Sequence, residues 1–253
     1  MVAEAHLDIW DCLLPSLPDG RIVSVSVGLY WTAVVADVRG MLRCGLAATL
    51  ANPEFETSRL PAVGEPGTLE NRPALELAGW VSSPSYTEAG IGLATINALL
   101  PPPASPADLK AQEYIAREGA GGRVALIGHF PFVSELRQRV RELWVLELNP
   151  QEGDLPASSA PEIIPQADVL AITSTTLINH TFAGLFVLRK PGAKTLLLGP
   201  STPLSPLLFG LGMHVLSGVV TQDPDQIVQR VRQGATFRQL RNHGVRLVTL
   251  GST

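Results

Sequence analysis

The sequence predicts an α/β protein with two unlike parts, a small α+β domain followed by a doubly wound, Rossmann-like domain built on a parallel sheet. The second half repeats short apolar runs that are separated by stretches of helical length, which is typical of a buried parallel sheet. The first half instead alternates apolar and polar residues, as half-buried strands do. Four prolines within residues 101–106 interrupt both helices and central strands. We therefore expect domains at residues 1–104 and 105–253.

Composition narrows the class of protein. The chain is 45% hydrophobic and 17% charged, so it is not a disordered chain. Its net charge of −4 divides into −6 over residues 1–107 and +2 over residues 108–253, which gives no electrostatic case for a nucleic-acid partner. No apolar run reaches the roughly 20 residues of a membrane span, and the acidic N-terminus is unlike a signal peptide. We expect a cytoplasmic protein that has no membrane partner and that can form a homo-oligomer.

Elements of the first half follow from local patterns. Val23, Val25 and Val27 alternate with Ser24, Ser26 and Gly28, which predicts a half-buried strand. The remaining predicted elements are a helix over Ala3–Leu14, strands over Thr32–Val38 and Leu42–Thr49 joined by a tight Arg39-Gly40 turn, a short helix over Leu75–Trp80 and a longer helix over Thr87–Leu100.

The longer helix carries a start signal and one unusual polar residue. Ser85 followed by Glu88 three residues later predicts a capping box. The helix is apolar on nearly every face, so we expect it to be buried. Asn97 must then find hydrogen-bond partners, either as a satisfied core amide or as an amide that reaches a ligand between the domains.

The second half predicts the sheet. Its expected strands are Val124–Gly128, Trp144–Leu148, Val169–Thr173, Thr195–Gly199, Val215–Val220 and Val245–Leu250, and its expected helices include Phe132–Glu142, Leu177–Arg189 and Asp223–Gly234. Ligands of such sheets bind beyond the carboxyl ends of the strands, so the loops that follow these strands hold the candidate site.

The first strand of this sheet runs into Gly128 and His129. Only one glycine is present, which disfavours a dinucleotide pyrophosphate, although the start of the next helix could receive a smaller anion. His129 is open to three interpretations: a ligand of a metal or small molecule, an acid/base group, or a loop residue that covers the end of the sheet.

The next strand ends in acidic and amide groups. Glu147 lies 19 residues after Gly128, close to the position of the acidic residue that binds a ribose diol in dinucleotide-binding folds. With Asn149 and Asp154 it offers oxygen atoms to a hydroxylated ligand or to a hard cation. We therefore take Glu147 and Asp154 as candidate metal ligands.

Hydroxyl groups gather at two further strand ends. Ser174, Thr175 and Thr176 open the segment that leads to Asn179, and Ser201 follows the strand that ends at Gly199. One N-cap accounts for a single hydroxyl, so the repetition indicates a polar ligand site. The five histidines are scattered, the two cysteines (Cys12 and Cys44) lack CxxC spacing, and no nucleophile motif is present, which leaves open whether the protein is an enzyme.

Five segments carry a resemblance to a known family. They read GIGLATINALL, VALIGHFPF, WVLELNPQEGDLP, ADVLAITSTTLINHT and TLLLGPSTPLSP, and in this order they resemble the “putative heavy-metal chelation” family. The resemblance implies an enolase N-terminal-like domain joined to a Rossmann-like domain. It places the family's polar motifs on Asn97, Gly128, Glu147, Asn149, Asp154, Ser174, Thr175, Thr176 and Asn179.

Two functions follow. The first is a cytoplasmic protein that binds a metal ion or a metal complex at a site in the interdomain cleft. The alternative is a small-molecule enzyme or sensor that binds a nucleotide-like or anionic ligand at the strand carboxyl ends. Soft heavy metals prefer thiolates or clustered imidazoles, whereas these loops are rich in oxygen, so we expect a hard cation or a metal carried within a larger ligand. A structural subunit with a filled cleft is the third interpretation.

Overall fold

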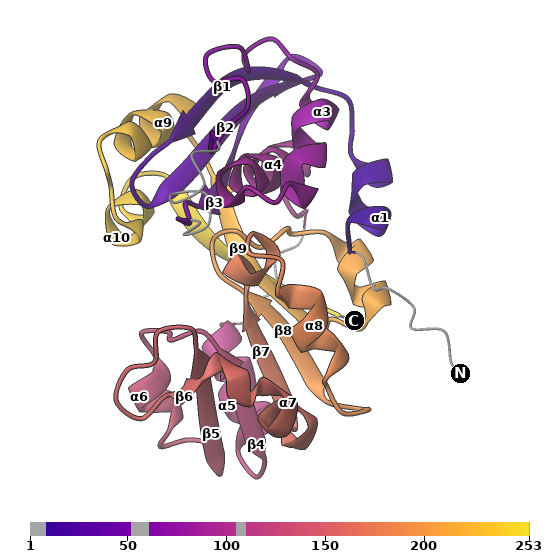
Figure 1. Cartoon of the computed structure of the whole chain (residues 1–253), viewed down its shortest axis with the longest axis vertical. Helices are drawn as coiled ribbons and strands as arrows, with labels where there is room; N and C mark the ends of the chain where they lie inside the picture. The colour runs from indigo at the N-terminus through magenta and orange to yellow at the C-terminus, as the bar shows by residue number, and fades with distance from the viewer. Residues whose placement is uncertain (1–8, 52–60, 105–109, 253) are drawn as a thin grey trace.

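The computed structural model describes residues 9–51, 61–104 and 110–252, and it contains two sheets (Figure 1). One is a three-stranded antiparallel sheet near the N-terminus, and the other is a seven-stranded, mostly parallel sheet. The predicted α/β class is confirmed. No described helix is long and apolar enough to cross a membrane.

The small sheet is a meander of β1 (Arg21–Val27), β2 (Trp31–Val38) and β3 (Met41–Ala48). Arg39 and Gly40 join the last two strands with positive φ angles of 56° and 81°, as the predicted tight turn requires. The Gly40 N–H donates to Asp37 Oδ1 at 2.7 Å and closes this turn.

The first strand differs from its valine pattern. Ile22 and Ser26 are buried in β1, whereas Val23 and Val27 are exposed. The register with β2 shifts between Ile22 and Ser24, so Val23 lies in a bulge. A bulge adds one residue to a strand, and this changes which side chains face the core. Alternation therefore predicts the strand correctly but not its buried face.

Three helical segments accompany this sheet: α1 (Ile9–Leu13) with the 3-10 turn η1 (Leu14–Ser16), α3 (Ala74–Ala78) with η2 (Gly79–Ser82), and α4 (Tyr86–Leu99). The predicted first helix is shorter at its end, because Pro15 falls in the 3-10 turn, and residues 3–8 lie outside the described residues. Helix α4 packs against β2 and β3, and from Ala89 to Leu99 every residue except Asn97 is buried, as its apolar sequence predicts.

The start of α4 corrects the predicted capping box. Ser85 does act as N-cap and accepts a bond from the Glu88 N–H at 3.4 Å. The Glu88 carboxylate, however, accepts from the Ser83 hydroxyl at 2.6 Å and from the Gly64 N–H at 2.9 Å. Glu88 therefore fixes the preceding loop to the helix instead of completing the box.

The large sheet contains β4 (Arg123–Ile127), β5 (Glu142–Glu147), β6 (Leu155–Pro156), β7 (Val169–Thr173), β8 (Lys194–Leu198), β9 (Val215–Thr221) and β10 (Val245–Gly251). Its strand order is β10-β9-β8-β7-β4-β5-β6, parallel throughout except for β10. This is the Rossmann order with one antiparallel strand, β10, added at an edge. Strands β5 and β6 are added on one side of β4, and the later strands, starting with β7, on its other side, so the strand order reverses between β4 and β7.

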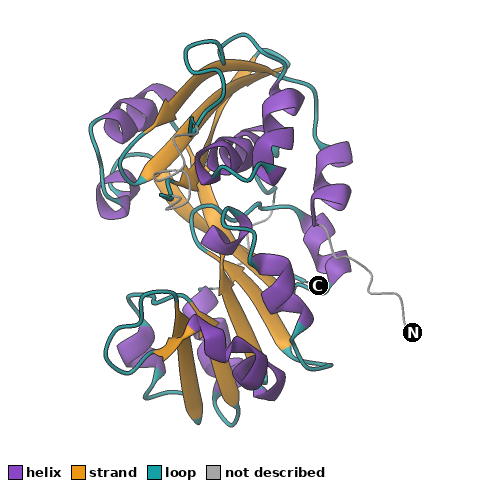
Figure 2. Ribbon diagram, viewed as in Figure 1, coloured by secondary structure: helices purple, strands orange, loops and turns teal. Residues whose placement is uncertain are grey.

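Helices cover both faces of this sheet (Figure 2). In β4 the side chains of Val124 and Leu126 belong to one core and those of Ala125 and Ile127 to another. The helical segments of this half are α5 (Ala111–Gly119), α6 (Val133–Leu136), η3 (Ala157–Ser159), α7 (Ala160–Ile163), η4 (Ile164–Gln166), η5 (Ser174–Leu177), α8 (Phe182–Val187), η6 (Pro206–Leu211), α9 (Pro224–Arg232) and α10 (Phe237–Arg241).

Two predicted helices are much shorter than expected. The helix predicted over Phe132–Glu142 is the four-residue α6, because β5 already begins at Glu142 and the intervening residues make the turn into the sheet. The helix predicted over Leu177–Arg189 is split into η5 and α8 by His180, whose φ of 59° is left-handed and incompatible with a continuing α-helix.

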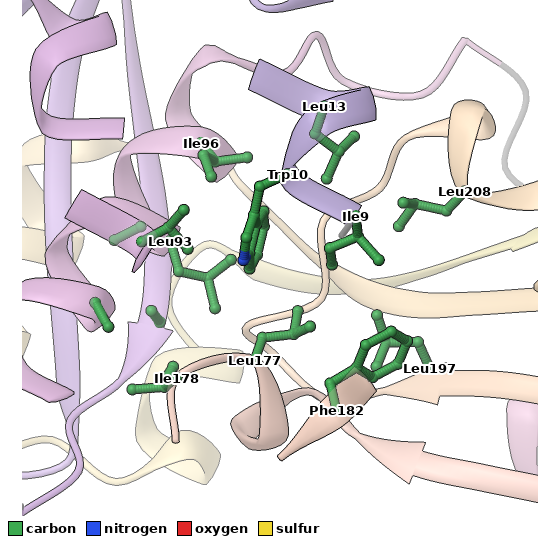
Figure 3. Close-up of a cluster of buried hydrophobic side chains, with 14 of the residues drawn as sticks. Ile9, Trp10, Leu13, Leu93, Ile96, Leu177, Ile178, Phe182, Leu197 and Leu208 are labelled. Carbon is green, nitrogen blue, oxygen red and sulfur yellow. The ribbon is translucent and has the colours of Figure 1, made fainter. Parts of the chain in front are cut away.

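The two halves share their cores. Ile9 and Trp10 of α1 lie in one cluster with Leu93 of α4 and with Leu177 and Phe182 of the second half (Figure 3). On the opposite face of the small sheet, the C-terminal α9 packs against β2 and β3 (Figure 1). Separate domains at residues 1–104 and 105–253 therefore remain a prediction, as does the likeness of the first part to an enolase N-terminal fold.

Candidate functional site

A pocket of about 380 Å³ opens at the carboxyl ends of β4, β5 and β7, where the strand order reverses. This is the place at which open α/β sheets bind ligands. Its lining consists of Ile127, Gly128, His129, Phe130, Leu146, Glu147, Leu148, Ala157, Ala160, Thr173, Thr175, Thr176, Asn179, Thr181 and Leu185. Apolar side chains thus form much of the wall, with a few polar groups among them.

Gly128 lets the chain leave β4 beside the neighbouring strand. Its φ is 103°, a left-handed value that side chains rarely adopt. A Cβ placed there would lie 3.1 Å from Thr173 Cβ of β7. The left-handed backbone and the close approach of β7 therefore explain why this position is a glycine. The turn that it makes brings His129 to the pocket.

His129 is held by a buried carboxylate. Its Nδ1 lies 2.8 Å from Asp154 Oδ2, and the Asp154 side chain is fully buried while the imidazole is 28% exposed. The Gln151 N–H also donates to Asp154 Oδ2 at 3.2 Å. A neutral imidazole that donates from Nδ1 carries its acceptor lone pair on Nε2. Asp154 therefore positions His129.

Glu147 holds the same loop through the backbone. Its Oε1 accepts from the His129 N–H at 2.7 Å, and its Oε2 accepts from the Leu148 N–H at 3.0 Å. The carboxylate also lines the pocket, so it contributes negative charge there.

The hydroxyl groups after β7 partly satisfy one another. Thr176 donates to the Thr173 carbonyl at 2.6 Å, and the Thr173 and Thr175 hydroxyls lie 3.0 Å apart. Asn179 Oδ1 accepts from the Thr181 hydroxyl at 2.7 Å, which leaves the Asn179 amide NH₂ group available for a ligand. Thr173 is the N-cap of η5, and local hydrogen bonds of this kind account for the Thr175 and Thr176 hydroxyls.

Five predicted site residues do not line the pocket: Asn97, Asn149, Asp154, Ser174 and Ser201. Ser174 is buried, and its Oγ lies against Gly199 without a hydrogen-bond partner. Asn149 is exposed and does not line the pocket. Asn97 Nδ2 donates to the carbonyls of Leu46 at 2.9 Å and Ser201 at 3.1 Å.

Asn97 and Ser201 are thus part of the junction between the two sheets. Ser201 Oγ accepts from the Ala48 N–H of β3 at 2.8 Å, so this serine also joins the two halves. Asn97 borders a separate hollow of about 270 Å³ that lies between β3 and β9. The geometry matches the interpretation of Asn97 as a satisfied core amide.

Two relevant residues are absent from the sequence-based candidates. Thr181 lines the pocket, and its position two residues after an asparagine is a local signal for the turn that it forms. Arg137 Nη2 lies 3.9 Å from Asp154 Oδ1 and donates to the Gly153 carbonyl at 2.8 Å. No sequence signal identifies Arg137, because this contact depends on how two loops fold against each other.

The donor groups do not fit a bare heavy-metal ion. Within the described ranges, no three His, Cys, Asp or Glu side chains are grouped so that they could hold a metal ion. Burial raises the pKa of the Cys44 thiol to about 12, so Cys44 offers no thiolate near neutral pH. Both Glu147 oxygens and Asp154 Oδ2 already accept hydrogen bonds, whereas the buried Asp154 Oδ1 has no hydrogen-bond partner.

Comparison with known proteins places the chain in a family. Residues 110–249 match a family model described as “Putative heavy-metal chelation”, and residues 10–100 match a second model with the same description. No functionally curated protein matches the sequence.

Two solved structures of unknown function from this family are similar. The Desulfitobacterium hafniense protein is 26% identical over 100% of both chains, with a TM-score of 0.80. The Pyrococcus horikoshii protein is 21% identical, covers 96% of this chain and 98% of its own, and has a TM-score of 0.81, which shows a shared fold. The chain therefore belongs to the family described as “Putative heavy-metal chelation”.

Proposed function

We propose that this protein binds a small, uncharged or cationic ligand in the pocket at the ends of β4, β5 and β7. The observation that carries the proposal is the charge of the lining. Glu147 contributes a carboxylate, and none of the described lining residues is a lysine or an arginine. A phosphate would meet this carboxylate without the cation that phosphate sites normally supply. The pocket therefore favours a metal complex or a neutral hydroxylated molecule over a nucleotide.

The family's description suggests a metal, and the geometry favours one that arrives with its own ligands. A structural zinc ion takes about four protein ligands, and softer metals prefer thiolates. The pocket offers one imidazole, at His129, beside a carboxylate that is already bonded to the backbone. In a metal complex, most coordination positions of the metal are already filled by the ligands of the complex, so the protein needs to supply few donor atoms.

A second candidate function is a small-molecule enzyme. The specific observation is the His129–Asp154 pair, because a carboxylate that fixes the imidazole tautomer is a common way to orient a general base. The substrate would then carry a hydroxyl group, or use a water molecule, from which His129 Nε2 removes a proton. Turnover of the added compound during incubation would distinguish this candidate from a binding protein.

A paired-ligand melting experiment tests the proposal. We would compare adenosine with adenosine monophosphate, and free Cu(II), Ni(II) and Fe(III) with their partly saturated chelates. A ligand at 100 times its dissociation constant adds about 2.7 kcal/mol to the stability of the native state, which corresponds to a shift of about 5–11 °C at 2–4 °C per kcal/mol for a chain of this size. We expect a chelate or the nucleoside to raise the melting temperature more than the phosphorylated or free-ion partner does.

Neighbouring residues provide the matched control. Thr175 lines the pocket and Ser174 does not. Thr175→Ala should reduce the ligand-induced shift, whereas Ser174→Ala should leave it unchanged. A larger shift with the nucleotide than with the nucleoside, or no shift with any chelate or neutral compound, would reject the proposed ligand class.

A further inference from the structure

We propose that the pocket supplies a single coordination bond, from His129 Nε2, to the metal of a complex that has an open coordination position. This inference rests on the proposed function and adds the atom that recognises the ligand. It assigns to Asp154 the role of positioning residue for the histidine, in place of a metal ligand.

The first argument is the state of the ring. Asp154 Oδ2 lies 2.8 Å from His129 Nδ1, and a carboxylate can only accept this bond. The proton of a neutral ring is then on Nδ1, and the lone pair is on Nε2. Histidines that ligate metals commonly donate their other N–H to a carboxylate in this way.

The second argument is that the ring is fixed yet reachable. The Asp154 side chain is fully buried and receives a second bond from the Gln151 N–H. The imidazole itself is 28% exposed and lines the pocket. A ligand can therefore reach His129 without moving the group that orients it.

The third argument is that the pocket lining offers no second unoccupied carboxylate oxygen beside the ring. Asp154 Oδ1 accepts no hydrogen bond, but it is buried 3.9 Å from Arg137 Nη2, and Asp154 does not line the pocket. Both Glu147 oxygens accept bonds from backbone N–H groups, one of them the N–H of His129. In the part of the chain that the structure describes, no cluster of three side chains could complete a metal's coordination. The remaining ligands must come from the bound molecule, and the Glu147 carboxylate favours a complex without net negative charge.

Copper chelates provide the test. Cu(II)–iminodiacetate leaves coordination positions free, whereas Cu(II)–EDTA is a saturated control. We expect the first chelate, added to the full chain, to show an electron paramagnetic resonance spectrum with nitrogen hyperfine structure from one imidazole, and the second to show none. His129→Ala should remove the tightest binding site, and Asp154→Asn should weaken it about 10–100-fold.

Exposed histidines also bind such chelates, so a matched variant is needed. His243 is exposed and lies outside the pocket. His243→Ala should leave the tight site unchanged. Retention of that site in His129→Ala, or equal effects of the two histidine variants, would overturn the inference.

An unmodified protein gives an independent readout in case Asp154→Asn fails to fold. Nitrogen-15 NMR of the wild-type imidazole should show the proton on Nδ1, and a proton on Nε2 instead would refute the assignment. If adenosine or another neutral compound still raises the melting temperature in a Thr175-dependent manner while the chelate does not bind at His129, the proposed function stands and this inference fails.

Discussion

Glu147 and Asp154 are separated by one loop, but their carboxylates contact different groups. Glu147 ends β5 and accepts two backbone N–H groups at the edge of the pocket. The Asp154 side chain is buried and does not line the pocket, and its Oδ2 holds the His129 ring. The residue type predicts carboxylate oxygens that can accept hydrogen bonds or bind a metal in both cases. Only the local contacts decide whether these oxygens face a ligand or another side chain.

Removing the Glu147 charge should destabilise the conformation of the loop that carries His129. Glu147→Gln keeps the shape but replaces one carboxylate oxygen with an NH₂ group that cannot accept a backbone N–H. Because a hydrogen bond to a charged group contributes about 1.5–3 kcal/mol, we expect a loss of about 1.5–3 kcal/mol in the free energy of unfolding, measured with urea. Glu142→Gln at the exposed start of β5 is the control, and an equal loss in both variants would contradict the assigned role.

Cys44 should make stability depend on pH in the alkaline range. Burial raises the pKa of its thiol from 9.0 to about 12. Between these values the unfolded chain releases a proton that the folded chain retains, so the free energy of unfolding should fall as the pH rises from 9 to 12. Urea unfolding of the wild type and of Cys44→Ala at pH 8 and pH 10 checks this. A wild-type loss no larger than that of the variant would contradict the prediction.

At the scale of elements, the packing of α4 on the small sheet is closer than its apolar sequence indicates. A Cβ at Gly45 of β3 would lie 2.0 Å from the Ala94 carbonyl and 2.4 Å from the Ala98 N–H nitrogen. Backbone atoms cannot move aside as a flexible side chain can. The absence of a side chain at Gly45 is therefore what allows this helix and strand to touch.

Gly45→Ala should separate the helix from the strand. Overpacking costs about 1–3 kcal/mol in well-packed cores, and contact with backbone places this position at the upper end of that range or above it. Thermal unfolding of purified protein measures the loss. Gly121→Ala is the control, because a Cβ there meets no atom within 4 Å, and similar melting temperatures for the two variants would show that the contact is not rigid.

At the scale of the whole molecule, a C-terminal helix packs against the N-terminal sheet. Ile227 and Val231 of α9 pack on Ala33, Val35 and Leu46 of the small sheet, opposite the face that α4 covers. The C-terminal segment is thus structurally part of the first half. The two family models match residues 10–100 and 110–249, but residues of the second stretch complete the core of the first.

Residues 1–104 alone should therefore not form a stable fold. One face of their sheet would expose the apolar surface that α9 and α10 cover in the full chain. We expect the fragment to aggregate or to show little tertiary signal in near-ultraviolet circular dichroism, while the full chain unfolds in a single calorimetric transition. A soluble fragment that melts cooperatively would instead establish two independent domains.

The sequence by itself determined every strand except the two-residue β6, together with the buried helix α4 and the class of fold, because apolar periodicity reflects local backbone geometry. It also identified Gly128, His129, Glu147, Thr175, Thr176 and Asn179, all of which line one pocket, because parallel strands end on the same edge of a sheet. Tertiary structure alone separated Asn97, Ser174 and Ser201 from that pocket and paired Asp154 with His129. These outcomes depend on strand order and on contacts between distant loops, which no local pattern encodes.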